Sequence, residues 1–120
     1  MPKRLLITDD AMIIRAMIRD AATEAGWEVV GEATNGGEAV ELYQSLQPDL
    51  VTLDLVMPEY DGLHALREIR RLNAEARVVI VSALNQKATL REALHLGACD
   101  FLVKPFAKPM LLETISRAVG

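Results

Sequence analysis

The sequence predicts an α/β fold, a doubly wound five-stranded parallel sheet covered by helices on both faces. Two observations lead to this prediction. Short apolar runs alternate with longer amphipathic stretches along the chain, and residues typical of helix ends stand between them. Strict alternation of strand and helix indicates parallel strands joined by right-handed crossovers, which place helices on both faces of the sheet.

The predicted strands are short apolar runs, and no linker, repeat or low-complexity tract interrupts their alternation with the helices. The five strands are Arg4 to Thr8, Glu28 to Ala33, Leu50 to Asp54, Arg77 to Ser82 and Asp100 to Val103.

The predicted helices carry apolar residues at three- and four-residue spacing. They are Met12 to Ala25, Gly37 to Leu46, Leu63 to Leu72, Lys87 to Leu96 and Pro109 to Val119. Gly26 and Gly97 stand where a helix C-terminus favours a left-handed residue. Asn35 precedes Glu38 by three positions, as in a capping box, and Pro109 suits a first helical turn.

Composition limits the classes of protein to which the chain can belong. Its 120 residues and 51% hydrophobic content predict one domain, spanning residues 1–120. A net charge of −4 argues against nucleic acid as the main partner. No apolar stretch reaches the ~18 residues of a membrane span, and the N-terminus has no signal-peptide core, so we expect a soluble, cytoplasmic protein without membrane insertion.

Polar side chains stand at the carboxyl ends of four of the predicted strands. Asp9 and Asp10 follow the first strand and Asp54 ends the third, while Ser82 ends the fourth and Lys104 follows the fifth. Ligands of open α/β sheets bind outside the carboxyl ends of the strands. We therefore expect these five side chains to form one site.

The chemistry of this group indicates a metal ion. Three neighbouring carboxylates repel one another unless they are protonated or bind a cation. Oxygen ligands without His or Cys select a hard ion, and a site with few carboxylates and open positions suits Mg²⁺. Mg²⁺ in turn suggests phosphoryl transfer, in which Asp54 attacks phosphorus in line while Lys104 and Ser82 hold the phosphoryl oxygens.

Each of these residues, taken singly, also has a structural interpretation. Asp10 and Ser82 fit helix caps, and Lys104 fits an ordinary solvated charge. The pair Asp61 and Gly62 is interpreted as a turn. The convergence of acids, hydroxyl and ammonium at one sheet edge favours the functional interpretation of the first three.

Four motifs together resemble the receiver domain of two-component response regulators, closely the single-domain chemotaxis type, over the whole length of the chain. They are the acidic pair Asp9-Asp10, the stretch Asp54 to Pro58 with Asp61-Gly62, the pair Ser82-Ala83, and Lys104-Pro105-Phe106. Periodicity does not give the strand order, and we adopt 2-1-3-4-5 by analogy with the flavodoxin-like and CheY-like folds.

The resemblance implies a role for each site residue. Asp54 is the phosphoacceptor, and Ser82 and Lys104 hold the phosphoryl group. The implied ligands of Mg²⁺ are Asp9, Asp10, Asp54 and the backbone carbonyl of Val56. A cis peptide bond is also implied before Pro105.

The resemblance also implies a conformational switch. Phosphorylation adds about −1.5 to −2 charge units, which would draw Ser82 toward the new oxygens and let Phe101 turn inward. Phe101 replaces the family's usual tyrosine, so the switch would work through packing. The surface of the fourth helix, fifth strand and fifth helix would then control protein partners. A sensor histidine kinase would act upstream, and a flagellar motor switch or other signalling protein downstream.

Two other classes share parts of this pattern. A small Mg²⁺-dependent phosphatase of the haloacid-dehalogenase type also uses an aspartyl nucleophile, but it needs a second Asp two residues later, where this chain has Val56. A flavodoxin-like cofactor binder needs a phosphate-binding loop after the first strand, where Thr8 is followed by Asp9 and Asp10. We therefore expect a phosphoacceptor switch and not a conventional enzyme.

Overall fold

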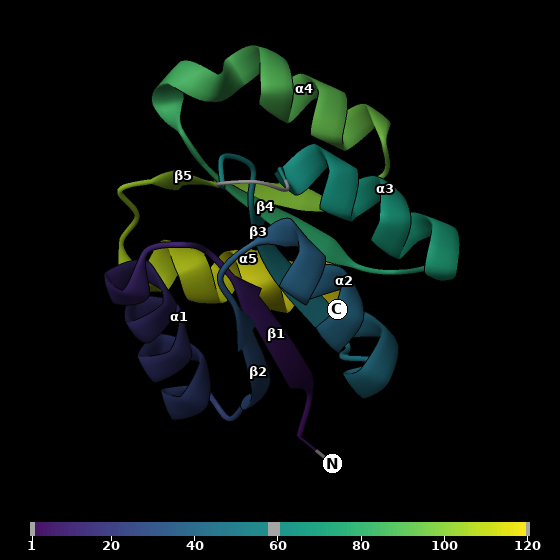
Figure 1. The fold of residues 1–120 in the computed structure, drawn as a ribbon. Coiled ribbons are helices and arrows are strands. Elements are labelled where there is room, and N and C mark those ends of the chain that lie inside the picture. Colours follow the sequence, from purple (N-terminus) through teal and green to yellow (C-terminus); the bar gives the residue numbers. More distant parts are fainter. Residues whose placement is uncertain (1, 58–60, 120) are drawn as a thin grey trace.

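The computed structural model describes residues 2–57 and 61–119, and it confirms the predicted fold class and strand order. Parallel strands form a sheet in the order β2-β1-β3-β4-β5 (Figure 1). They are β1 (Arg4–Thr8), β2 (Glu28–Ala33), β3 (Leu50–Asp54), β4 (Val78–Ala83) and β5 (Asp100–Lys104).

The helices cover the two faces of this sheet. They are α1 (Met12–Glu24), α2 (Gly36–Leu46), α3 (Gly62–Leu72), α4 (Lys87–His95) and α5 (Lys108–Val119), with a short 3₁₀ helix η1 (Leu84–Gln86) before α4. Helices α1 and α5 lie on one face, and α2, α3 and α4 lie on the other (Figure 1). Every helix within the described ranges is too short or too polar to traverse a lipid bilayer.

Two apolar layers hold the sheet between the helices. In β1, the side chains of Leu5 and Ile7 pack toward α1 and α5, whereas Leu6 packs toward α2 and α3. All three are fully buried, as expected of a parallel sheet that is covered on both faces. The strand ends are therefore held rigidly, which fixes the positions of the polar residues that follow them.

The residues predicted to mark the ends of α1, α2 and α4 do so, with one difference in the cap of α2. Gly26 and Gly97 have φ values of +96° and +106°, the left-handed region that glycine adopts at low cost. The Asn35 side chain accepts a hydrogen bond from the Glu38 amide at 2.9 Å. The Glu38 carboxylate, however, accepts from the backbone amide of Thr34 and not from that of Asn35, so the box closes one residue earlier than predicted.

The interpretation of Asp61 and Gly62 as a turn is wrong. Asp61 is the N-cap of α3, and its carboxylate accepts a hydrogen bond from the His64 amide at 2.8 Å. Gly62 is the first residue of that helix. An aspartate at the N-cap accepts a hydrogen bond from an amide that would otherwise be unpaired at the start of a helix. Asp61 has this role directly before the apolar stripe that was predicted for α3.

Candidate functional site

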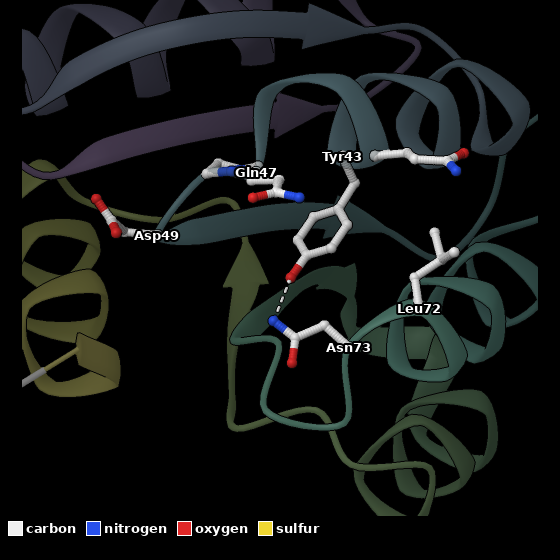
Figure 2. Close-up of a pocket in the computed structure, with 7 residues that line it drawn as sticks. Tyr43, Gln47, Asp49, Leu72 and Asn73 are labelled. Carbon is white, nitrogen blue, oxygen red and sulfur yellow. Dashed lines mark hydrogen bonds between the residues drawn. The ribbon is translucent and has the colours of Figure 1, made fainter.

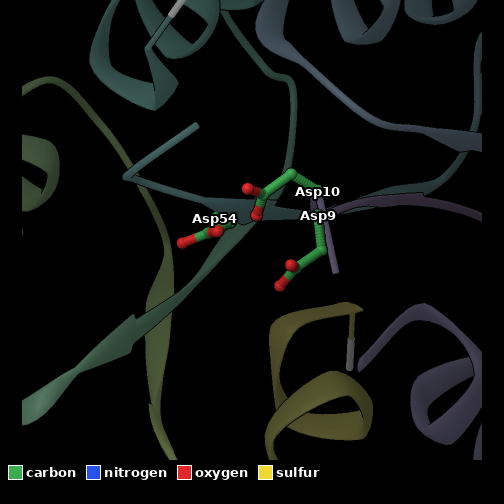
Figure 3. A group of neighbouring side chains, drawn as sticks. All are labelled: Asp9, Asp10 and Asp54. Atoms are coloured by element: carbon green, nitrogen blue, oxygen red, sulfur yellow. The ribbon is translucent and has the colours of Figure 1, made fainter. Parts of the chain in front are cut away.

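Three carboxylates meet at the carboxyl edge of the sheet. Asp9 and Asp10 follow β1, and Asp54 ends β3, which pairs directly with β1. One carboxylate oxygen from each residue lies within 4.8 Å of the others. Figure 3 shows the three side chains projecting into a common space. Asp9 and Asp54 are buried, whereas Asp10 is exposed. The structure thus brings together the three acids that were expected to share a site.

Lys104 reaches this group from the end of β5. Its Nζ lies 2.8 Å from Asp9 Oδ2 and 3.5 Å from Asp54 Oδ2. Desolvation lowers the pKa of Lys104, but the hydrogen bond to Asp9 and the charge of Asp54 outweigh it, so the net pKa lies above its ordinary value. Lys104 is therefore a protonated partner of two acids and not a solvated surface charge. The peptide bond between Lys104 and Pro105 is cis.

Backbone amides orient two of the acids. The Ala11 amide donates to Asp9 Oδ1 at 2.9 Å, and the Val56 amide donates to Asp54 Oδ1 at 3.3 Å. Asp10 does not cap α1, because the N-cap of that helix is Ala11 and no side chain caps it. The cap interpretation of Asp10 is therefore set aside.

The electrostatics of the cluster favour a bound cation. Burial, reinforced by the charge of Asp9, raises the pKa of Asp54 to about 6, although Lys104 opposes this shift. One ammonium thus faces three carboxylates, and negative charge remains in excess. The acids offer only oxygen ligands, and a hard divalent ion such as Mg²⁺ matches both their chemistry and their charge.

Ser82 lies at the end of the neighbouring strand β4. Its Oγ is buried and has no hydrogen-bond partner in the described parts of the chain, so it is not a helix cap. A cavity of about 220 Å³ lies between Ser82 and strand β5. The lining residues are Ser82, Ala83, Lys87, Leu90, Phe101 and Val103. Phe101 points partly outward, with 40% of its surface exposed.

Comparison with known families accounts for this arrangement. The family model for the response regulator receiver domain matches residues 5–116. The chain belongs to the response regulator receiver domain family.

Two relatives of this receiver domain match over nearly their whole length. The chain is 48% identical to the "Chemotaxis protein CheY" of Thermotoga maritima, with 98% of each chain covered. It is 47% identical to the "Chemotaxis protein CheY" of Bacillus subtilis over the full length of both.

Solved receiver structures show the same fold. The structure of the CheX-CheY-BeF3-Mg complex from Borrelia burgdorferi superposes with a TM-score of 0.95 at 31% identity, covering 100% of this chain and 91% of that chain. The response regulator domain of Thermotoga maritima CheB gives a TM-score of 0.88 at 37% identity, covering 99% and 97%.

Gly62 lies against the backbone of Asp54 and Leu55, a contact that sequence reasoning missed although it placed Gly62 in a receiver motif. Its amide donates to the Leu55 carbonyl at 3.0 Å, and a Cβ atom at this position would lie 2.3 Å from the Asp54 carbonyl oxygen. Only a glycine lets α3 begin so close to the strand that carries Asp54. The one signal in the sequence was the glycine itself. Pro58, part of the same motif, lies outside the described residues.

A larger cavity of the receiver domain, of about 540 Å³, lies at the opposite edge of the sheet. Figure 2 shows it between the ends of α2 and α3, where the Asn73 side chain donates a hydrogen bond to the Tyr43 hydroxyl at 3.1 Å. Among the described residues, Asp49 is the one acid in its lining, and it accepts from the Arg4 amide. This cavity therefore lacks the acid cluster of the carboxyl edge.

Proposed function

We propose that this chain acts in the cytoplasm as a single-domain response regulator, like the CheY relatives that it matches over 98% and 100% of their length. A sensor histidine kinase supplies a phosphoryl group to Asp54 in a Mg²⁺-dependent reaction, and the surface of α4, β5 and α5 then controls protein partners. The observation that carries this proposal is the buried Asp54 carboxylate, which shares its site with two further acids and one ammonium.

The proposed reaction is a displacement at phosphorus. An Asp54 carboxylate oxygen forms a bond to phosphorus while the bond to the donor nitrogen breaks, and that nitrogen keeps the electron pair. Lys104 would pair with a phosphoryl oxygen, since its ammonium already lies between Asp9 and Asp54. The unpartnered Ser82 hydroxyl would donate to another phosphoryl oxygen.

The metal ligands proposed for this reaction are Asp9, Asp10, Asp54 and the backbone carbonyl of Val56. Bound Mg²⁺ would neutralise the excess negative charge and help to orient the phosphoryl oxygens. The acid cluster and its charge balance support this assignment. The similar CheY of Borrelia burgdorferi supports it too, since its structure is a complex with BeF3 and Mg.

The switch proposed here couples Ser82 to Phe101. When Ser82 moves toward the phosphoryl group, the cavity between the two residues receives the partly exposed Phe101 ring. That movement changes the surface presented by β5 and its neighbours α4 and α5. The names of the relatives, "Chemotaxis protein CheY", suggest chemotaxis as the process. The partner downstream would be a flagellar motor switch or another signalling protein.

Phosphorylation by acetyl phosphate, followed by peptide mass spectrometry, tests the site. We expect Mg²⁺-dependent modification of Asp54 in the wild type and none in Asp54→Ala. Asp49→Asn, at the other edge of the sheet, is the matched control and keeps the modification. Modification of a different side chain, or full modification in the presence of EDTA, would contradict the proposal. Sustained hydrolysis of a generic phosphate ester would favour the phosphatase instead.

A further inference from the structure

Arg15, in α1, contacts the loop that carries Asp9 and Asp10. Its side chain is only 14% exposed, and its guanidinium makes two separate contacts. Nη1 donates to the backbone carbonyl oxygen of Asp9 at 2.8 Å, and Nε donates to Glu32 Oε1 on β2 at 3.1 Å. Arg19, one turn later, donates to the other oxygen of Glu32 but makes no hydrogen bond to Asp9 in the described structure.

The position of Arg15 is unfavourable for helix stability alone. Cations near a helix N-terminus face the positive end of the helix dipole. The first turn of α1 has no acidic residue, and its N-cap residue, Ala11, makes no side-chain cap hydrogen bond. The charge of Arg15 is balanced instead by Glu32 from a neighbouring strand. This arrangement indicates that Arg15 acts on the loop before the helix.

The carbonyl group that Arg15 holds belongs to the peptide between Asp9 and Asp10. On the other side of Asp9, the backbone amide donates to the Ala33 carbonyl of β2 at 3.0 Å. Both backbone polar groups of Asp9 are therefore linked to the end of β2. The amide is linked directly, and the carbonyl is linked through Arg15 and Glu32. The next residue, Asp10, is exposed, and its direction depends on how that peptide is held.

We propose that Arg15 is a positioning residue for Mg²⁺ binding, an inference that rests on the function proposed above. It fixes the plane of the Asp9–Asp10 peptide and thereby holds the Asp10 carboxylate toward the other two acids. Mg²⁺ requires near-ideal octahedral geometry, so misdirection of one ligand weakens binding. Residues that orient metal ligands typically contribute about 10- to 100-fold in affinity.

Charge and positioning predict opposite effects of removing Arg15. A guanidinium close to a cation site repels the cation, so removal of its charge alone would tighten Mg²⁺ binding. Loss of positioning would weaken Mg²⁺ binding. The sign of the change therefore separates the two roles.

The test compares Mg²⁺ affinities, measured by calorimetric titration at constant ionic strength. We expect Arg15→Met to bind about tenfold more weakly than the wild type. Arg15→Lys keeps the charge but lacks the fork that contacts Asp9 and Glu32 together, so it also loses affinity. Arg19→Met removes the other partner of Glu32 and is the matched control, with affinity within about twofold of the wild type.

A second measurement uses the metal-free protein. Backbone amide shifts of Asp10 and Ala11 should change in Arg15→Met and stay unchanged in Arg19→Met. Unchanged or tighter Mg²⁺ binding by Arg15→Met, or by Arg15→Lys if the Met variant does not fold, would overturn the inference. An equal loss in Arg19→Met would overturn it too. A wild type that binds no Mg²⁺ would overturn the proposed function itself, together with this inference.

Discussion

The Lys104 ammonium lies closer to Asp9 than to Asp54, so it stabilises the Asp54 carboxylate less. Lys104 Nζ lies 2.8 Å from Asp9 but 3.5 Å from Asp54, and both acids are buried. Burial and the charge of Asp9 therefore raise the pKa of Asp54 to about 6. An acid in this position gains when a cation approaches, because the cation stabilises the charged form that the protein alone disfavours.

Replacing this acid by its neutral isostere should stabilise the metal-free protein. The folded-state pKa of Asp54 is raised from 3.8 to about 6, so its contribution to stability is complete below the unfolded pKa and lost as the pH rises through about 6. We predict that Asp54→Asn raises the free energy of unfolding by roughly 2 to 3 kcal/mol at neutral pH and above.

Urea unfolding with EDTA from acidic to mildly alkaline pH measures this difference. The advantage of Asp54→Asn should grow between about pH 4 and 7 and then level off. Asp49→Asn controls for amide replacement at a strand end. An advantage that shrinks with rising pH would show that the Asp54 carboxylate is stabilised in the folded protein.

The individual residues show how far sequence reasoning reaches. The three acids, Ser82 and Lys104 were predicted to meet, because parallel strands end at one edge of the sheet. The contacts of Arg15 and Gly62 were not predicted. They depend on how closely a helix approaches a loop or strand, and apolar periodicity carries no information about that distance.

At the level of single elements, β3 contains an unsatisfied polar group. Thr52 is fully buried, and its Oγ1 has no hydrogen-bond partner in the described parts of the chain. A buried hydroxyl without a partner loses its hydration without compensation. Its neighbours along β3, Val51 and Leu53, are apolar and fully buried.

We predict that Thr52→Val raises the free energy of unfolding by about 1 kcal/mol, because valine has a similar shape and no hydroxyl to desolvate. Chemical denaturation measures the change. Thr114→Val is the matched control: Thr114 is equally buried, but its hydroxyl donates to the Met110 carbonyl at 2.7 Å. That variant should be neutral or less stable. If Thr52→Val lowers the free energy of unfolding as much as Thr114→Val does, the Thr52 hydroxyl has a hydrogen-bond partner.

Element boundaries were predicted to within a residue or two because glycine, asparagine and proline mark helix ends directly. The exceptions have local causes. The 3₁₀ helix η1 was not predicted, because it follows β4 directly and no periodic pattern exists in so short a segment. Asp61 was assigned to a turn because Asp-Gly favours turns and helix starts alike.

For the whole molecule, Mg²⁺ should act as a stabilising ligand. A ligand that binds only the folded state at 100 times its Kd adds about 2.7 kcal/mol to the free energy of unfolding. We predict a gain of this size for the wild type. Asp10→Asn should lose most of it, while its metal-free stability changes by no more than about 0.5 kcal/mol because Asp10 is exposed.

Unfolding with and without Mg²⁺ measures both effects, and Asp49→Asn should respond to Mg²⁺ like the wild type. A full Mg²⁺ response in Asp10→Asn would remove Asp10 from the proposed ligand set.

The strand order that underlies this site came from analogy, since periodicity gives the elements but not their neighbours, and the structure confirms it.

That order also limits which amino acid can serve at position 104. Strand β4 separates β5 from β3, and β1 lies one strand further away; neighbouring strands lie ~4.8 Å apart. The side chains of Asp9 and Asp54 close part of this gap, and the Lys104 ammonium closes the rest. A histidine side chain is shorter than that of lysine and would not contact both acids, so strand spacing itself favours a long, flexible cation here.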